Sequence, residues 1–313
     1  MRAVVVSEGA LSVAERPDPT PERGELLVRV RSAGLNGADM LQRAGLYPPP
    51  PGVAADIPGL ELAGVVEALG AGVTRFAAGD AVMAIVSGAG QAELAIVHER
   101  VAMPVPSALD WPQAGAFPET FTTAHDALFT QCGLGSGERV LINGAAGGVG
   151  ISAVQLAVAA GATVVASVRS QGLRARVESF GAEVVDPAQA GESGPYDVVL
   201  ELVGAPNLAT DVNALAIGGR IAVIGVGAGA VAEIDLRALM GRRGRIHGST
   251  LRARALEEKA DAARRIERHV LPLVEAGKLT VPIEATYPLE EAAAAYDRFT
   301  AGGKLGKIVL LPG

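Results

Sequence analysis

The first part of the chain shows the short alternation of apolar and polar residues that is typical of half-buried strands. In the run 25–31, Leu26 and Val30 fall on one face and Arg29 on the other. Glycine-rich turns separate this run from further short apolar runs at Leu62–Ala68, Ala81–Val86 and Glu93–Val97. Strands at this spacing predict a small sandwich or a partly open barrel over the first ~115 residues.

From about Glu138 the period changes, and apolar strands alternate with helices. The pattern predicts strands at Arg139–Asn143, Thr163–Val168, Asp197–Leu202 and Arg220–Ile224, with helices ending at Ala160, over Gly172–Phe180 and near Asn207–Ala216. Strands that are apolar throughout and alternate with helices form a parallel, doubly wound (Rossmann) sheet. The fold class is therefore α/β, with a mainly β first domain.

The C-terminal part adds a long amphipathic helix, expected from Leu256 to a stop at Gly277, and a last strand at Lys307–Leu311. That strand lies outside the alternation and is expected to return to the first domain. The predicted domains are therefore 1–118 with 278–313, and 119–277. The run Pro48–Pro51 is expected to be an exposed loop.

Composition and charge exclude several classes to which the protein could belong. Hydrophobic residues make up 49% of the 313 residues and charged residues 19%, which provides a substantial core. The net charge of −7 argues against a general nucleic-acid binder. The single cysteine, Cys132, excludes a disulfide framework. The short apolar run at the start of the chain does not resemble a signal peptide. A cytoplasmic location is therefore expected. The uncharged stretch Val140–Val168 is divided by glycines, which indicates a buried α/β unit rather than a membrane span.

A glycine-rich loop follows the strand Arg139–Asn143 and precedes an apolar helix, which is the context that a dinucleotide-binding loop requires. Glycine is expected at 144 for the tight turn, at 147 for approach of a pyrophosphate and at 150 for close packing. The first turn of the helix would present N–H groups to that anion. The alternative is a tight turn that binds nothing. The candidate cofactor residues of this loop are Gly144, Ala146, Gly147, Gly148, Val149 and Gly150.

The second strand of the unit lacks the acidic residue that selects NAD by binding the ribose 2′-hydroxyl. It is followed instead by Arg169 and Ser170, with Arg174 one turn further on. A guanidinium and a hydroxyl suit a 2′-phosphate, so the sequence favours NADPH as the cofactor. The alternative is that both arginines are solvated residues at the start of a helix.

The chain resembles the zinc-free NADPH:quinone oxidoreductases (the zeta-crystallin family) of the medium-chain dehydrogenase/reductase superfamily, almost from end to end. The first domain of that superfamily is GroES-like. The stretch Asn36–Gly52, Pro118-Glu119 and Ser249–Arg252 is especially similar to the p53-inducible quinone oxidoreductase branch. Other segments that carry the resemblance are Leu35–Asp39, Pro58–Gly64, Thr123-Ala124, Ala145–Gly150 and Gly306–Val309.

The resemblance also implies that no metal is bound. Where zinc enzymes of the superfamily have a cysteine and a Gly-His-Glu, this chain has Asn36 and Gly59-Leu60-Glu61. Its four histidines show no ligand spacing. Without a metal or a nucleophile, the cofactor itself supplies the reactive group. The expected reaction is hydride transfer from NADPH to a quinone.

By the same resemblance, Asn36, Tyr47 and Thr123 lie near the nicotinamide and the acceptor and are the candidate catalytic residues. Tyr47 would stack on a flat ring or donate its hydroxyl to an oxyanion. The alternatives are a loop aromatic packed on prolines for Tyr47, an Asn-Gly turn for Asn36 and a helix cap for Thr123. Further cofactor-binding candidates are Val203, Gly204, Gly225, Val226, Leu251 and Lys307.

Some positions depart from the family pattern. A lysine that commonly helps to bind the 2′-phosphate is replaced by Leu173, and a tyrosine after the third strand is replaced near Asp186. Two other functions stay open: an NADPH-dependent reductase of α,β-unsaturated carbonyls (enals, enones or enoyl thioesters) and a non-catalytic, crystallin-like nucleotide-binding protein. The expected partners are a small-molecule quinone or enone and a second copy of the chain, paired through an edge strand near Arg245–Ser249.

Overall fold

The computed structural model describes residues 1–313, which form two compact units. The first unit comprises residues 1–122, 251–302 and 307–313, and the second comprises 123–250 and 303–306. The segment 251–277, which the sequence pattern places in the nucleotide domain, therefore belongs to the first unit. The reason is that its helix packs there through ion pairs and hydrogen bonds, such as those from Arg75 to Glu267 and from Arg264 to the Ala102 carbonyl.

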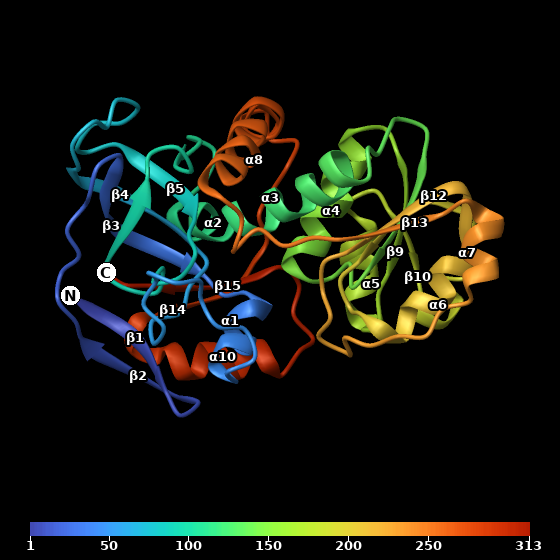
Figure 1. Ribbon diagram of the computed structural model, residues 1–313, viewed down its shortest axis with the longest axis horizontal. Coiled ribbons are helices and arrows are strands. Elements are labelled where there is room, and N and C mark those ends of the chain that lie inside the picture. The colour runs from blue at the N-terminus through green and yellow to red at the C-terminus, as the bar shows by residue number, and fades with distance from the viewer. The chain divides into compact units, whose positions relative to one another are not determined.

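The first unit is built on a seven-stranded sheet of order β14-β15-β3-β4-β5-β7, with β6 paired to β3 (Figure 1). The alternation of residues 25–31 fits this position, since Leu26, Val28 and Val30 are fully buried in the hydrophobic core beside this sheet. The last strand returns to this unit as predicted and pairs with both β14 and β3. The strands are β1 Arg2–Ser7, β2 Ala10–Glu15, β3 Glu25–Gly34, β4 Glu61–Leu69, β5 Ala81–Ile85, β6 Leu94–His98, β7 Met103–Pro104, β14 Ile283–Pro288 and β15 Lys307–Leu311, of which β1 and β2 form a separate hairpin.

Short helices cover this sheet. Asp110 begins one of them by accepting a hydrogen bond from the backbone N–H of Gln113. The helix expected up to Gly277 is in fact two helices that meet at Val270, because Pro272 has no N–H to donate and its ring blocks continuation of the first helix. The helices are α1 Gly37–Arg43, α2 Trp111–Ala116, α3 Pro118–His125 (which contains the boundary between the two units), α8 Leu256–His269, α9 Leu271–Glu275 and α10 Ala292–Thr300, with a 3₁₀ turn at Leu289–Glu291.

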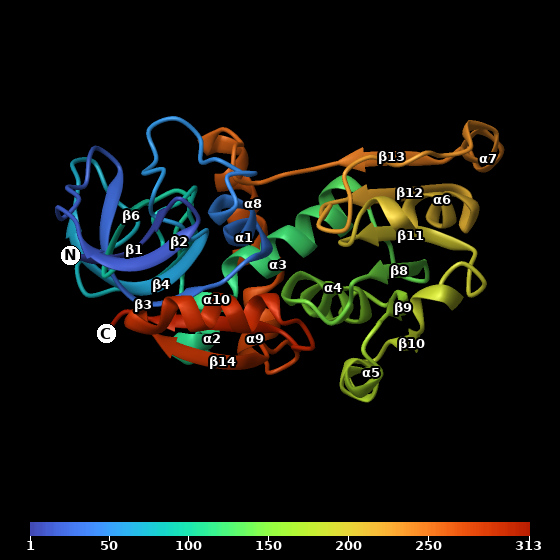
Figure 2. The same cartoon turned by 90° about the horizontal axis from the view of Figure 1, so that it is seen from below.

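The second unit is a parallel six-stranded sheet of order β10-β9-β8-β11-β12-β13, which confirms the predicted doubly wound fold. Figure 2 shows its strands one above another from β13 to β10. The strands are β8 Arg139–Asn143, β9 Thr163–Ser167, β10 Glu183–Val185, β11 Tyr196–Glu201, β12 Leu215–Val223 and β13 Arg245–Gly248. The helices are a π-helical turn Asp126–Gln131, α4 Gly148–Ala159, α5 Gln171–Glu178, a 3₁₀ turn Pro187–Gln189, α6 Ala205–Asn213 and α7 Leu236–Arg242.

Two details of the second unit bear on the predictions. The helix expected to continue to Ala216 ends at Asn213, and β12 begins at Leu215 because its backbone pairs there with Tyr196 of β11. The strand β13 lies at the edge of the sheet, as predicted, with β12 as its only neighbour. None of the helices is long and apolar enough to cross a membrane.

Candidate active site

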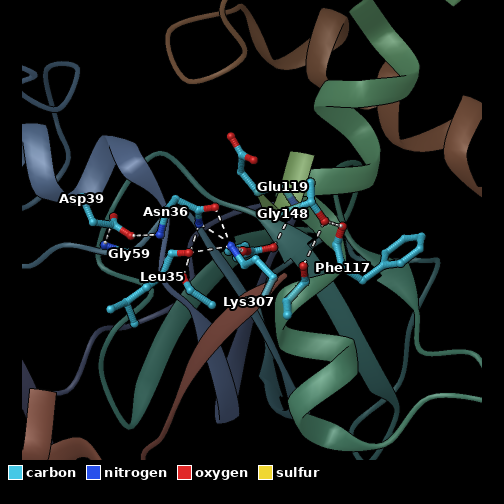
Figure 3. A network of polar contacts seen from close by, with 12 residues as sticks. Leu35, Asn36, Asp39, Gly59, Phe117, Glu119, Gly148 and Lys307 are labelled. Carbon is cyan, nitrogen blue, oxygen red and sulfur yellow. Dashed lines mark hydrogen bonds and ion pairs between the residues drawn. The ribbon is translucent and has the colours of Figure 1, made fainter. Parts of the chain in front are cut away.

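A buried polar network lies where β3 ends and α1 begins in the first unit (Figure 3). The antiparallel neighbours of β3 supply its other members: β15 begins with Lys307, and β4 begins with Glu61. Sheet pairing therefore brings together residues that lie more than 200 positions apart in the sequence. The network is a product of topology rather than of local sequence.

The ammonium of Lys307 is the centre of this network. It donates to the Leu35 carbonyl oxygen and to Asn36 Oδ1, each at 2.6 Å, and forms an ion pair with Glu61 Oε1 at 2.6 Å. The side chains of Lys307 and Glu61 are 5% and 0% exposed. The three close partners of this ammonium all belong to the protein. These contacts favour a structural role for Lys307, and its contribution to cofactor binding stays a prediction.

Lys307 and Glu61 also fix the amide of Asn36. Oδ1 accepts from Lys307, and Nδ2 donates to Glu61 Oε1 at 3.0 Å and to the Gly34 carbonyl at 3.3 Å. Glu61 Oε2 in turn accepts the backbone N–H of Glu119 at 2.9 Å. Both amide hydrogens of Asn36 are thus occupied, which favours a role in organising the site over direct donation to an acceptor oxygen.

A second carboxyl group, Asp39, closes the network at the first turn of α1. It accepts the backbone N–H groups of Asn36 at 2.8 Å and of Gly59 at 3.2 Å. Burial raises the pKa of Asp39 to about 6, although these hydrogen bonds and the charge of Lys307 act in the opposite direction. The network therefore gains or loses a proton near neutral pH.

Tyr47 is held by Arg252, a residue to which the sequence analysis assigns no role. The Arg252 guanidinium lies 4.9 Å from the centre of the Tyr47 ring and donates to the Tyr47 carbonyl oxygen at 2.9 Å. It also donates to the Ser87 carbonyl oxygen at 2.8 Å and to Gln42 Oε1 at 2.5 Å. Arg252 is 4% exposed and forms no ion pair. The one signal for it was its place in the segment Ser249–Arg252 of the resemblance.

The contacts of Tyr47 run through its ring and its carbonyl oxygen and none through its hydroxyl. Burial raises the pKa of this phenol above its ordinary value, while the charge of Arg252 acts to lower it. Tyr47 therefore stays protonated at neutral pH, with its hydroxyl available as a donor. The partner that the structure gives to its ring is the Arg252 guanidinium.

In the second unit, the glycine-rich loop connects β8 to α4 as predicted. Gly144 has a φ of +75°, which an ordinary side chain would strain. A Cβ on Gly150 would lie 2.5 Å from the Gly144 carbonyl oxygen, so only glycine fits there. A Cβ on Gly147 would meet nothing closer than 3.5 Å. Packing inside the protein therefore requires Gly144 and Gly150 but not Gly147, the position expected to admit a pyrophosphate.

The start of α4 provides donors beside this loop. Gly147 is its N-cap and has no side chain to accept from the first turn, which also contains no acidic residue. Ala146 accepts the backbone N–H of Gly306 at 3.2 Å, so the segment 303–306 borders the loop. The residues present fit a dinucleotide pyrophosphate.

The two arginines predicted to bind the 2′-phosphate, near the turn between β9 and α5, have different contacts in the structure. Arg169 is exposed and forms no hydrogen bond or ion pair. Arg174 instead donates to the Val168 carbonyl at 3.1 Å and pairs with Asp186 at 2.5 Å. The Ser170 hydroxyl forms no capping bond at the start of α5. Arg169 and Ser170 are thus free to meet a 2′-phosphate, whereas Arg174 is already paired with the acidic residue that departs from the family pattern.

The loops after β11 and β12 bring together the next predicted cofactor residues. A Cβ on Gly204 would lie 2.8 Å from Val226 Cα, and one on Gly225 would lie 2.3 Å from the Leu202 carbonyl oxygen. These loops border a cavity of about 200 Å³ that is lined by Glu201, Gly204, Ala205, Leu208, Val223, Val226, Gly229, Ala230 and Ala232. The carboxyl ends of parallel strands are where doubly wound sheets bind ligands.

Glu201, at the wall of this cavity, belongs to a buried carboxyl pair that the sequence analysis missed. Asn143 Nδ2 donates to Glu201 Oε2 at 2.7 Å and to Asp211 Oδ1 at 2.9 Å. Glu201 Oε1 accepts the backbone N–H of Gly204 at 2.7 Å, which ties the pair to the cofactor loop. Burial and the neighbouring Glu201 raise the pKa of Asp211 to about 8, so Asp211 is a neutral acid at pH 7.

This raised pKa predicts a pH-dependent stability. Between about pH 4 and pH 8 folded Asp211 binds more protons than the unfolded chain, so the free energy of unfolding falls as pH rises through this window. The variant Asp211→Asn has an amide at this position, which is uncharged like the protonated carboxyl group but does not titrate. We expect its free energy of unfolding, relative to that of the unmodified protein, to rise steadily between pH 5 and pH 9, as measured by urea unfolding. A difference that does not grow with pH would contradict this.

The remaining candidates lie in different places. Thr123 lies inside α3 and is buried, so the alternative that it caps a helix starting at Ala124 is wrong: the helix begins at Pro118. Leu251 belongs to the first unit and Thr123 to the second. Their predicted contacts with acceptor and cofactor stay predictions.

The residues at the position of the superfamily's catalytic zinc do not fit a metal ion. Asn36 and Glu61 are the oxygen donors there, and the Lys307 ammonium lies 2.6 Å from both. A cation already neutralises this site, and it would repel a second one. The structure contains no group of three or more His, Cys, Asp or Glu residues that could hold a metal ion.

Comparisons with known proteins place this fold and site in a family. Residues 22–131 match the alcohol dehydrogenase GroES-like domain, and residues 160–310 match the zinc-binding dehydrogenase domain. The chain is 34% identical to the quinone oxidoreductase of Rattus norvegicus, over 94% of this chain and 91% of that protein. The chain belongs to the quinone oxidoreductase family. This family lies within the medium-chain dehydrogenase/reductase superfamily, as the sequence predicts.

Two further likenesses bear on cofactor and substrate. A mycobacterial protein solved in complex with NADPH superposes with a TM-score of 0.87 at 26% identity, with all of both chains covered. A segment of the erythronolide synthase of Saccharopolyspora erythraea, 9% of that protein, is 35% identical over 98% of this chain. The quinone oxidoreductase family is thus not alone in using this scaffold.

Proposed function

We propose that the protein is an NADPH-dependent quinone oxidoreductase that works without metal. The observation that carries the proposal is the combination of a dinucleotide loop that fits a pyrophosphate with a zinc position filled by the Lys307 ammonium. When bound, NADPH would supply a hydride. Gly147 and the first turn of α4 would hold the pyrophosphate, and Arg169 with Ser170 the 2′-phosphate.

On the acceptor side we propose Tyr47 as the residue that contacts the quinone. Its ring and its carbonyl oxygen are held by Arg252, so we expect the ring to bind a flat molecule at small entropic cost. The hydroxyl, which has no partner in the protein, is the other group it offers. The buried network of Lys307, Glu61 and Asn36 would keep this part of the site rigid and charged.

The two parts of Tyr47 are tested by two substitutions. If the ring is a stacking platform, Tyr47→Phe leaves quinone kinetics nearly unchanged, whereas Tyr47→Ala raises KM for quinone. If the hydroxyl stabilises an oxyanion, Tyr47→Phe already lowers kcat about tenfold or more, since a lost oxyanion donor costs on the order of 100-fold. We expect the stacking result, because a quinone accepts a hydride readily. Unmodified kinetics in both variants would show that Tyr47 is only a packing residue.

Within the family, we infer kinship with the p53-inducible branch. The segments that carry this resemblance contribute Asn36, Glu119 and Arg252 to the contacts described above. The support for this proposal is the match of those segments, whose residues take part in the buried network and in the contacts of Tyr47.

We also propose a homodimer formed through the second unit. The edge strand β13 carries unpaired backbone groups that a twofold partner would pair, which would extend the sheet. Large apolar side chains are exposed on the same unit, namely Ile217, Val231, Leu236 and Met240. We expect a solution mass of two subunits at micromolar concentration, measured by light scattering. A mass of one subunit would contradict this proposal.

The activity is tested with a panel of quinones, enals, enones and enoyl thioesters, each with NADPH and with NADH in the presence of a chelator. The proposal predicts the highest kcat/KM for quinones with NADPH, unaffected by the chelator. Preference for an enone or a thioester would instead favour a reductase of α,β-unsaturated carbonyls. Absence of turnover with every acceptor would favour a non-catalytic role.

A further inference from the structure

The first unit contains a large cavity that the proposed reaction does not use. Its volume is about 550 Å³, within the range of about 300–1,000 Å³ that small-molecule sites occupy. All its lining residues belong to the first unit. Its apolar wall comes from the loop 52–57, from β5 and β6 and from α8, and includes Val53, Ile57, Ile85, Leu94, Ile96 and Leu256.

Most charged groups along this cavity have partners. Arg16 pairs with Asp56 at 2.8 Å, and the amino terminus pairs with Asp18 at 2.6 Å. Glu25 accepts the backbone N–H of Glu22, and His98 Nδ1 accepts that of Arg100. These groups therefore satisfy one another or the backbone.

Lys259 of α8 is the exception. Its ammonium donates to Ser87 Oγ at 2.8 Å and to the Arg252 carbonyl at 3.3 Å, both neutral acceptors, and it forms no ion pair. Its neighbour Arg252 is a buried guanidinium that also lacks a carboxylate. Burial lowers the pKa of both cations. An uncompensated, partly buried positive charge at an apolar cavity is complementary to a single anionic group on an apolar molecule.

We propose that this cavity binds an amphiphilic carboxylate, an apolar molecule with one carboxyl group, whose carboxylate pairs with Lys259. The apolar part lies against the side chains of β5, β6 and α8. Because Ser87 bonds to both Lys259 and Arg252, the occupied site adjoins the support of Tyr47. This inference does not depend on the proposed reaction.

The probe is decanoate, titrated by calorimetry into the full-length protein without NADPH or quinone. We expect one decanoate per chain and at least tenfold weaker binding to Lys259→Met. Lys259→Arg, which keeps the charge, should bind nearly as well as the unmodified protein. Lys278→Met, at an exposed lysine outside the cavity, is the matched control and should change nothing. Decanol should bind more weakly than decanoate and should be indifferent to Lys259→Met.

A second variant tests the place of binding. Ala54 lines the cavity and is exposed, so Ala54→Trp fills the space without disturbing the core. It should abolish decanoate binding while the thermal unfolding temperature stays unchanged. Absence of binding to the unmodified protein, or binding that is insensitive to both Lys259→Met and Ala54→Trp, would overturn the proposal. Because no turnover is measured, a failure of the quinone reductase proposal would leave this result unaffected.

Discussion

Replacing Lys307 by methionine is expected to lower the free energy of unfolding by about 3–5 kcal/mol, the usual cost of breaking a buried ion pair from one side. Lys307→Met leaves the Glu61 carboxylate fully buried without its counter-charge and removes a donor from Asn36 Oδ1. The loss is measured by urea unfolding, followed by a probe in the first unit. Because the three close partners of the Lys307 ammonium all belong to the protein, we expect the Kd for NADPH to change far less than the stability does.

The matched control is the double variant Lys307→Met with Glu61→Gln. Replacing both charges removes the desolvation penalty on the stranded carboxylate, so the double variant should be more stable than Lys307→Met alone. The amide introduced by Glu61→Gln keeps an oxygen that can accept the Glu119 N–H. A single variant within about 1 kcal/mol of the unmodified protein would show that the pair contributes little to folding.

Arg169→Ala is expected to weaken NADPH binding by about 1.5–3 kcal/mol, roughly 10- to 150-fold, and to leave NADH binding nearly unchanged. The reason is that Arg169 is exposed and unpaired, so its guanidinium is free to bind the 2′-phosphate. The two dissociation constants are measured by fluorescence titration. Equal affinity of the unmodified protein for NADPH and NADH would contradict the assignment.

Arg174→Ala provides the comparison. Arg174 is paired with Asp186 and the Val168 carbonyl, so its loss should reduce stability more than it reduces selectivity for NADPH. If Arg174→Ala erodes the preference as strongly as Arg169→Ala does, the ion pair with Asp186 must open when the cofactor binds. The double variant is expected to lose the preference entirely.

The sequence by itself determined the features that depend on local pattern. The strand β8, the glycine-rich loop and α4 could be predicted almost to the residue, because an apolar strand, a turn that needs Gly144 and a helix start are all written in adjacent positions. The edge position of β13 followed from the strand order of this fold. The return of β15 could be predicted because it stands outside the alternation.

Only the tertiary structure decided which side chains are free and which are already bonded. Arg169 and Arg174 look equivalent in the sequence, but in the structure Asp186, at the end of the strand paired with β9, forms an ion pair with Arg174. Lys307 looks like a cofactor ligand in the sequence, but β15 and β4 place it against Asn36 and Glu61. Hydrogen bonds between distant residues depend on which strands pair, and the local pattern that predicts each strand does not identify its partner strand.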